Sequence, residues 1–509
     1  MAAVEQAKNY IDGKWSWPEG AQAIRSLNPA DTREVVCEAP DSPASEVARA
    51  VEAAYRAFPA WRRTPPPARA ALLRRAGEIL AERKEQIGRL IAREAGKPIA
   101  EGRGDVQEAI DMAELAAGEG RRLYGDTTPS ELPNKMCLTL REPVGVCGLI
   151  TPWNFPVAIP AWKAFHALIC GNPIVLKPAS DTPLCGAWFV QALVDAGIPP
   201  GVVNLVQGRG SVIGEALCNH PRVALVSITG STETGRAVAA ACGRNGKRVS
   251  LECGGKNAQI VMDDADLDLA VEGALWGAFG TSGQRCTATS RLILHEAIHD
   301  EVLRRLVARA SRLRLGPGTD ERTEMGPLIN ESQCRKVLGY IRIGREEDKA
   351  TLLCGGQRAE DESLRYGWFV KPTIFADVTR PMRIFQEEIF GPVLAVIKVA
   401  SLEEAVESLN DSQYGLSSSI YTRNVNQAMW AMREIEAGIV YINGPTIGAE
   451  VHLPFGGVKG TGNGHREAGR IGLDIFSEWK TVYIDYSGRL QRAQIDTESL
   501  VATTAGRKE

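Results

Sequence analysis

The 509-residue sequence predicts an α/β protein made of two units, each a parallel sheet covered by helices on both faces. Three observations support this class. The chain is too long for one ordinary domain. Its early part has apolar residues at helical spacing, and from Leu138 short apolar runs alternate with helix-like segments.

The early part of the chain, residues 45 to 125, is predicted to be helical. Residues 45–58 and 67–96 carry apolar side chains at helical spacing, and the second of these helices is expected to end at Gly96 and Pro98.

The later part of the chain is predicted to alternate strands and helices. The first unit has strands at 144–151, 173–177, 203–206, 224–229 and 258–262, with helices such as 184–197 and 265–279. The alternation resumes after Cys286 with a strand at 290–296, a helix at 297–313, and strands at 351–356, 394–399 and 438–443. Residues 478–487 form a late strand, and the last fifteen or so, which are polar, are expected to be loosely held.

Composition and charge exclude several classes of function. The net charge of −3 gives no electrostatic reason to bind nucleic acid or acidic membranes, and no apolar run approaches the roughly 20 residues of a membrane span. The eleven cysteines lack a CxxC pair, and no two histidines have metal-ligand spacing. We therefore expect a cytoplasmic protein without disulfides or a metal.

Nucleotide binding is suggested by glycine-rich turns that follow predicted strands. In "VSITGSTETG", Gly230 permits a tight turn and Ser231 can donate to a phosphate at the start of a helix. Neither this run nor "GRGSVIG" at 208–214 has the G-x-G-x-x-G spacing, so an ordinary capped turn remains an alternative for each. Lys177, at the end of a strand, is either a ribose or phosphate ligand or a solvated lysine. No Walker A sequence is present.

Three further residues carry groups suited to catalysis. Asn154, in the proline-bounded loop "TPWNFP", is either part of a structural turn or an amide donor for an oxyanion. Glu252 ends an apolar strand and is either solvated or a general base. Buried cysteines are usually inert, but a neighbouring cation such as Arg285 can lower the pKa of a thiol such as that of Cys286.

Six motifs taken together identify a family resemblance. "TPWNFP", "GSTETG", "LECGGKN", "FGTSGQRC", "EEIFGPV" and "PFGG" occur in an order and at spacings that resemble the aldehyde dehydrogenase superfamily, from about residue 10 to 485. The resemblance implies a Rossmann-like NAD(P)-binding domain (1–122 and 144–254), an α/β catalytic domain (255–470) and a small β arm (123–143 and 478–500). The arm would serve assembly into a homodimer or homotetramer.

The resemblance also implies roles for matching residues. Cys286 would be the nucleophile, Glu252 the general base, and the Asn154 side chain with the Cys286 backbone N–H the oxyanion hole. Thiolate addition to an aldehyde, hydride loss to the nicotinamide and hydrolysis of the resulting thioester would then give the acid. The cofactor-binding residues would be Thr151, Pro152, Trp153, Lys177, Ser180, Gly210, Gly230, Ser231, Glu388 and Phe390.

Cofactor choice and substrate depend on a few positions. Ser180 stands where many NAD-preferring members have glutamate, so we expect NADP to be accepted alongside NAD. Arg285 suits the distal carboxylate of a semialdehyde, although a structural salt bridge is an alternative. The substrate residues would be Arg285, Thr287 and Glu108.

Two semialdehyde branches resemble this chain. The α-aminoadipic branch is favoured first, and Glu108 would meet the substrate's amino group there. "GQRCTATSR" is also similar to α-ketoglutaric semialdehyde dehydrogenases, and succinic semialdehyde is a third possibility. The run "PFGGVKGTGNGHREAG" departs from the aminoadipic branch. A thiol esterase or acyltransferase is the rival class, but it would leave "GSTETG", Lys177 and Glu388 without a purpose.

Overall fold

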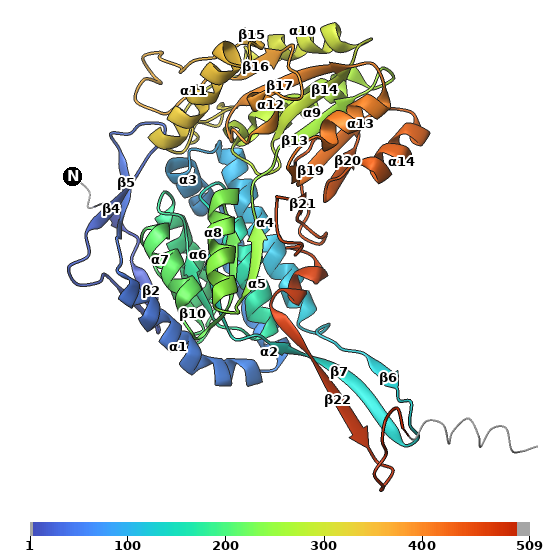
Figure 1. Ribbon diagram of the computed structural model, residues 1–509. Helices are drawn as coiled ribbons and strands as arrows, with labels where there is room; N and C mark the ends of the chain where they lie inside the picture. The colour runs from blue at the N-terminus through green and yellow to red at the C-terminus, as the bar shows by residue number, and fades with distance from the viewer. Residues whose placement is uncertain (1–3, 496–509) are drawn as a thin grey trace, which may run out of the picture.

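The computed structural model describes residues 4 to 495 and shows two layered α/β units with a projecting arm (Figure 1). The expectation for the loosely held last residues lies outside the described residues, as do residues 496–500 of the predicted arm. Within residues 4–495, no helix is long and apolar enough to cross a lipid bilayer.

The first sheet has seven strands in the order β12-β11-β8-β9-β10-β2-β3. The five strands from β12 to β10 are parallel, and β2 and β3 extend the sheet in antiparallel fashion. Their bounds are β12 Arg248–Glu252, β11 Val223–Thr229, β8 Val146–Ile150, β9 Ile174–Lys177, β10 Val203–Leu205, β2 Asn9–Ile11 and β3 Lys14–Ser16.

Helices cover both faces of this sheet, as the alternation predicts. One face packs against α1 (Ala44–Arg63), α7 (Gly210–Asn219) and α8 (Thr232–Arg244). The other packs against α5 (Ala158–Cys170) and α6 (Pro183–Asp195), and these are covered by α2 (Pro66–Glu82), α3 (Lys84–Glu94) and α4 (Ile99–Glu119).

The long helix predicted over residues 67–96 is wrong in one respect, because it is broken at Arg83. This residue has φ −101° and ψ 7°, so α2 ends at Glu82 and α3 restarts at Lys84. The Arg83 guanidinium pairs with Asp195 at 2.6 Å, a contact 112 residues away in sequence. The helical spacing of apolar residues continues through the break, which is why periodicity does not reveal it.

The second sheet also has seven strands, in the order β15-β16-β17-β14-β13-β19-β20, with only the edge strand β15 antiparallel. The strands are β15 Thr351–Cys354, β16 Thr373–Ala376, β17 Val393–Val399, β14 Thr289–His295, β13 Asn257–Val261, β19 Ser417–Tyr421 and β20 Ile439–Ile442. The residue pattern alone placed the strand near 258–262 with the first unit, but β13 lies in the second sheet. Periodicity reports burial and does not say which sheet a strand joins.

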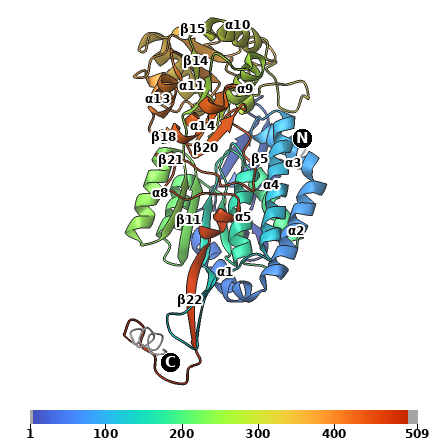
Figure 2. The same cartoon turned by 90° about the vertical axis from the view of Figure 1, so that its right-hand side faces the viewer.

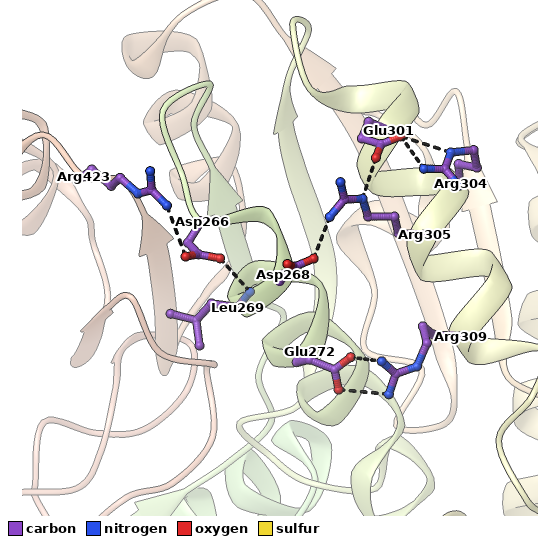
Figure 3. A network of polar contacts seen from close by, with 9 residues as sticks. All are labelled: Asp266, Asp268, Leu269, Glu272, Glu301, Arg304, Arg305, Arg309 and Arg423. Carbon is purple, nitrogen blue, oxygen red and sulfur yellow. Dashed lines mark hydrogen bonds and ion pairs between the residues drawn. The ribbon is translucent and has the colours of Figure 1, made fainter.

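Helices again flank this sheet on both faces. Helices α9 (Leu267–Phe279) and α10 (His299–Ala310) share one apolar cluster with the strands, and α11 (Glu331–Glu346), α13 (Leu402–Asn410) and α14 (Val425–Glu434) share the other, with the short α12 (Arg383–Gln386). Figure 3 shows exposed ion pairs that join α9 to α10, such as Asp268 with Arg305 at 2.6 Å. Exposed pairs of this kind contribute little, so the apolar contacts hold the two helices together.

Smaller sheets complete the fold. Strands β6 (Thr127–Pro129), β7 (Lys135–Pro143) and β22 (Ser477–Asp485) form the antiparallel arm that projects from the body (Figure 2). Near the amino terminus, β1 (Glu5–Gln6), β5 (Val35–Pro40) and β4 (Ala23–Leu27) form a third sheet. Two strands, β18 (Tyr414–Gly415) and β21 (Val458–Lys459), form a two-stranded antiparallel sheet, and a short 3₁₀ helix spans Arg470–Asp474.

Candidate active site

The predicted site residues gather where the strands of the first sheet end. Asn154 follows β8, Lys177 is the last residue of β9, Ser231 follows β11, and Glu252 is the last residue of β12. All four strands are parallel neighbours, so their carboxyl ends meet at one edge, the usual place for a ligand in such sheets. The loop that precedes β14 of the second sheet brings Cys286 to the same edge.

Two adjoining cavities meet at Cys286. Thr229, Cys253 and Cys286 line both of them. We call the first the cofactor-side cavity; it is also lined by Pro152, Trp153, Asn154, Gly230, Ser231, Gly254, Gln333, Lys336, Glu388 and Phe390. We call the second the substrate-side cavity; it is also lined by Glu108, Phe155, Ile159, Trp162, Glu252, Arg285, Thr287, Gly448, Ala449, Phe455 and Glu467.

The Cys286 loop is held in an unusual backbone conformation. Thr281 and Ser282 both have positive φ, 51° and 56°, which is uncommon for residues other than glycine and costs about 1–3 kcal/mol each. Tertiary contacts hold this shape. Glu101 of α4 accepts hydrogen bonds from the Thr281 N–H at 3.0 Å and from its hydroxyl at 2.6 Å, and the Ser282 hydroxyl donates to Gly326 O at 2.7 Å.

The glycines of "LECGGKN" allow this loop to approach closely. A Cβ on Gly255 would lie 2.5 Å from the Cys286 carbonyl oxygen, and a Cβ on Gly254 would lie 2.4 Å from the Glu388 carboxylate. Both distances are too short for a side chain. The pair of glycines therefore permits the contact between the end of β12, the Cys286 loop and Glu388.

The Cys286 thiol is not activated by Arg285, contrary to the expectation from their adjacency in sequence. The Arg285 guanidinium turns away to donate from Nε to the Thr281 hydroxyl at 2.8 Å. Burial, followed by the negative charges of Glu252 and Glu388, raises the pKa of Cys286 to about 12. The thiol is therefore protonated at neutral pH and needs a base to remove its proton.

Glu252 is a carboxyl group without a hydrogen-bond partner among residues 4–495. It is 3 % exposed, and neither of its oxygens is hydrogen-bonded. Burial and the nearby charge of Glu467 raise its pKa well above the ordinary value. Glu467 is paired with Lys163 of α5, whose ammonium also donates to the Ser227 hydroxyl at 2.9 Å. A carboxyl group in this state can hold or release a proton within the substrate-side cavity.

Asn154 is held in place through both its side chain and its backbone. Its Nδ2 donates to the Gln284 carbonyl at 3.0 Å, which leaves the second N–H of the amide free for another acceptor. Its backbone oxygen accepts from the Lys97 ammonium at 3.0 Å, and Lys97 pairs with Asp105 at 3.0 Å in a fully buried contact. Asp105 in turn accepts from the Ala158 N–H at 2.7 Å at the start of α5.

The cofactor-side residues present donors suited to a dinucleotide. Ser231 caps α8, so the amino terminus of that helix faces the cavity. Burial lowers the pKa of Lys177 to about 8, and a Cβ on Gly210 would lie 3.8 Å from its ammonium. The Ser180 hydroxyl donates to Gly208 O at 3.0 Å. Ser231 and the α8 amino terminus can therefore hold a phosphate at this cavity, whereas Lys177, Ser180 and Gly210 do not line it.

Three residues predicted to contact the cofactor, Trp153, Glu388 and Phe390, line this cavity. Glu388 accepts from the Gly255 N–H at 2.9 Å. The rings of Trp153 and Phe390 meet edge to face at 5.5 Å, and Phe390 has a positive φ of 60°. Thr151 is buried directly after β8 and does not line either cavity.

On the substrate side, Arg285 both lines the cavity and makes structural contacts. Its Nη2 lies 3.7 Å from Glu101, and its guanidinium lies 5.4 Å from the centre of the Phe155 ring. The two sequence interpretations, a carboxylate clamp and a structural salt bridge, are therefore compatible. Thr287 and Glu108 line the same cavity.

Several residues that shape the site were not predicted from the sequence. Lys97, Glu101 and Asp105 hold the two loops that carry Asn154 and Cys286, and Lys163 and Glu467 adjoin Glu252. One signal was available: Lys163 interrupts the apolar helix "AIPAWKAFHALIC", where an unpaired buried charge would be costly. Within residues 4–495, no cluster of His, Cys, Asp and Glu could hold a metal ion.

Comparisons with known proteins agree with this arrangement. A model of the aldehyde dehydrogenase family matches residues 15–482. The chain is 41% identical over 476 residues to α-ketoglutaric semialdehyde dehydrogenase of Bacillus subtilis, covering 94% of this chain and 97% of the relative. It is 44% identical over 483 residues to α-ketoglutarate semialdehyde dehydrogenase of Haloferax volcanii, covering 95% and 100%. The structure resembles betaine aldehyde dehydrogenase of Staphylococcus aureus in complex with NAD+, with a TM-score of 0.93 and 33% identity over 96% of each chain.

Proposed function

The chain belongs to the aldehyde dehydrogenase family, and we propose on this premise that it oxidises α-ketoglutaric semialdehyde to the dicarboxylic acid with NAD or NADP. Two relatives that carry this substrate in their names favour it over the α-aminoadipic semialdehyde that the sequence motifs favoured first. The observation that carries the proposal is the placement of Cys286 between a cavity with dinucleotide donors and a cavity that holds Arg285.

We propose that Cys286 forms the covalent bond to the aldehyde carbon. The thiol proton passes to the Glu252 carboxylate as sulfur adds, and the oxyanion accepts hydrogen bonds from Asn154 Nδ2 and the Cys286 backbone N–H. A nicotinamide held beside Cys286 would supply the hydride acceptor that this oxidation requires. Glu252 then releases the thiol proton to solvent and takes a proton from the water that attacks the thioester. As the carbon–sulfur bond breaks, this proton passes to the sulfur and the thiol is restored.

We propose that the first-sheet unit holds the cofactor. Lys177 would bind the adenosine ribose, Ser231 and the α8 amino terminus the pyrophosphate, and Glu388 the nicotinamide ribose. The side chain of Ser180 carries no negative charge, so it allows a 2′-phosphate. Ser180→Glu should lower kcat/KM for NADP by about a hundredfold, because placing like charges together costs several kcal/mol. The kcat/KM for NAD should change little. Equal losses for both cofactors would contradict this role.

We propose that Arg285 binds the distal carboxylate of the substrate. A hydrogen bond to a charged group contributes about 1.5–3 kcal/mol, so Arg285→Ala should raise KM for α-ketoglutaric semialdehyde by about 10- to 100-fold. KM for hexanal, which has no carboxylate, should change little. Arg285→Lys keeps the positive charge but not the bidentate geometry, so its KM for α-ketoglutaric semialdehyde should lie between those of wild type and Arg285→Ala. Equal increases in KM for the two aldehydes would contradict the proposal that Arg285 binds the carboxylate.

We propose that the arm mediates assembly into a homodimer or homotetramer. Met136, Leu140, Ile484, Trp479 and Tyr483 are large exposed hydrophobic side chains on its strands. Such an apolar surface on a projecting ribbon is typical of a subunit contact. Light scattering after size-exclusion chromatography should give more than one chain per particle, and Leu140→Glu with Ile484→Glu should give monomers. A monomeric wild-type chain would contradict the proposal.

A further inference from the structure

We propose that Glu108 recognises the 2-oxo acid end of the substrate as a neutral carboxylic acid, by donating its proton to a substrate oxygen beside Arg285. This inference rests on the proposed function and assigns a specificity-determining residue to it. Glu108 would thereby select an oxygen-bearing end over an amino-bearing end.

The first observation is the position of Glu108 on α4. Glu101, Asp105 and Glu108 are spaced by four and three residues, so they lie along one face of the helix. Glu101 is committed to Thr281, and Asp105 to Lys97 and the start of α5. Glu108 comes next along this face and lines the substrate-side cavity with Arg285 and Cys286.

The second observation is that Glu108 is uncommitted. Among residues 4–495, no group forms a hydrogen bond or an ion pair with its carboxyl, although two of its neighbours on the same helix face are fully engaged. Glu108 is half-buried and lines the cavity, so its unpartnered carboxyl can reach a ligand there. The carboxyl therefore remains available to a substrate.

The charges around Glu108 determine whether its carboxyl group is protonated when it binds a substrate. Burial and Asp105 raise its pKa, Lys97 and Arg285 lower it, and Asp111 raises it, with a result of about 8. Glu252 and Glu467 add two further carboxyl groups to the walls of the same cavity. At neutral pH the Glu108 carboxyl is therefore mostly protonated and can act as a donor.

The chemistry of the substrate end explains why a protonated acid is useful. The oxygens of a 2-oxo carboxylate only accept hydrogen bonds, so this end needs donors from the protein, and Arg285 and neutral Glu108 supply them. An ionised Glu108 would instead repel the carboxylate and attract an ammonium group. The protonation state of Glu108 thus discriminates between 2-oxo and 2-amino semialdehydes.

The inference predicts a pH dependence with a definite sign. As pH rises through about 8, Glu108 loses its proton, and the fraction of enzyme able to bind a 2-oxo acid falls. The apparent KM for α-ketoglutaric semialdehyde should therefore rise about tenfold between about pH 7 and about pH 9, since apparent affinity scales with the competent fraction. The KM for α-aminoadipic semialdehyde should fall over the same range.

The test compares wild type with Glu108→Gln, which keeps an N–H donor but cannot ionise. The variant should show a flat KM for α-ketoglutaric and succinic semialdehydes over this range, and hexanal should be unaffected in both enzymes. A rise in KM that persists in Glu108→Gln, or an equal rise for hexanal, would overturn the inference. Succinic semialdehyde, which also ends in a carboxylate, separates the two proposals. If α-ketoglutaric semialdehyde is a poor substrate, the proposed function fails, but the pH dependence of KM for succinic semialdehyde still tests the role of Glu108.

A binding measurement gives a readout that does not depend on turnover. Titration calorimetry of α-ketoglutarate, the acid that the reaction forms, in buffers of different ionisation enthalpy counts the protons taken up on binding. Near pH 8.5 the wild-type protein should take up most of one proton per site, and Glu108→Gln should take up none. Equal proton uptake by the two proteins would contradict the role of Glu108.

Discussion

Replacing Asn154 by alanine tests the proposed oxyanion site most sharply. The change removes the free N–H of a side-chain amide that donates to the Gln284 carbonyl, on a residue whose backbone oxygen accepts from Lys97. Loss of one preorganised oxyanion donor typically lowers kcat by about 10²–10³, or about 2.7–4 kcal/mol. Because negative charge on the aldehyde oxygen develops only after sulfur adds, KM should change little while kcat falls.

The same change has a separate cost in stability. Without the amide, the buried Gln284 carbonyl loses its donor, which costs about 1–3 kcal/mol of unfolding free energy. Gln284→Met is a matched control, because it removes the hydrogen bond from Ile329 N–H to the Gln284 side chain but no oxyanion donor. It should lower the urea midpoint similarly and change kcat by less than about tenfold.

The assay is the rate of reduced nicotinamide formation at saturating aldehyde and cofactor, with urea unfolding measured on the same preparations. If Asn154→Ala kept kcat within about threefold of wild type, the amide would not stabilise the oxyanion. A rise in KM at constant kcat would equally refute the reasoning, because it would assign Asn154 to ground-state binding.

Three other predictions follow from the buried charges. Glu252→Gln should lower kcat by about 10²–10⁴, because it removes the base for both thiol addition and thioester hydrolysis; a kcat within about tenfold of wild type would argue against this role. Because the pKa of Glu252 is raised, its base form appears as pH rises, so the wild-type kcat should rise with pH and that of Glu252→Gln should not. Lys97→Met leaves Asp105 buried and unpaired, which should cost about 3–5 kcal/mol of unfolding free energy and lower kcat more than KM. Lys97→Met combined with Asp105→Asn should regain part of the stability but not the position of Asn154; full recovery of kcat would show that Lys97 only stabilises the fold.

The sequence predicted those parts of the molecule that local patterns determine. Alternating apolar runs located the strands that end at Lys177 and Glu252, and the family resemblance of the motifs pointed to Cys286 as the nucleophile. Neither strand-to-sheet assignment nor the break at Arg83 could be predicted, because both depend on contacts distant in sequence.

The electrostatics of the site could not be predicted for the same reason. The adjacency of Arg285 and Cys286 indicated an activated thiol, yet the positive φ of Thr281 turns the chain so that Arg285 binds Thr281 and approaches Glu101. The pKa of Cys286 responds instead to burial and to Glu252, which is 34 positions earlier in the sequence. Such environments exist only after the two sheets have met.

The central claim is that the Cys286 sulfur carries the acyl group. Wild-type enzyme would be mixed with α-ketoglutaric semialdehyde and NAD, quenched in acid within the first turnover and digested for mass spectrometry. We predict that the mass of the thioester adduct lies on the peptide that contains Cys286. Location of the adduct on the peptide that contains Cys253, which lines the same two cavities, or acid formation with no adduct, would contradict the account.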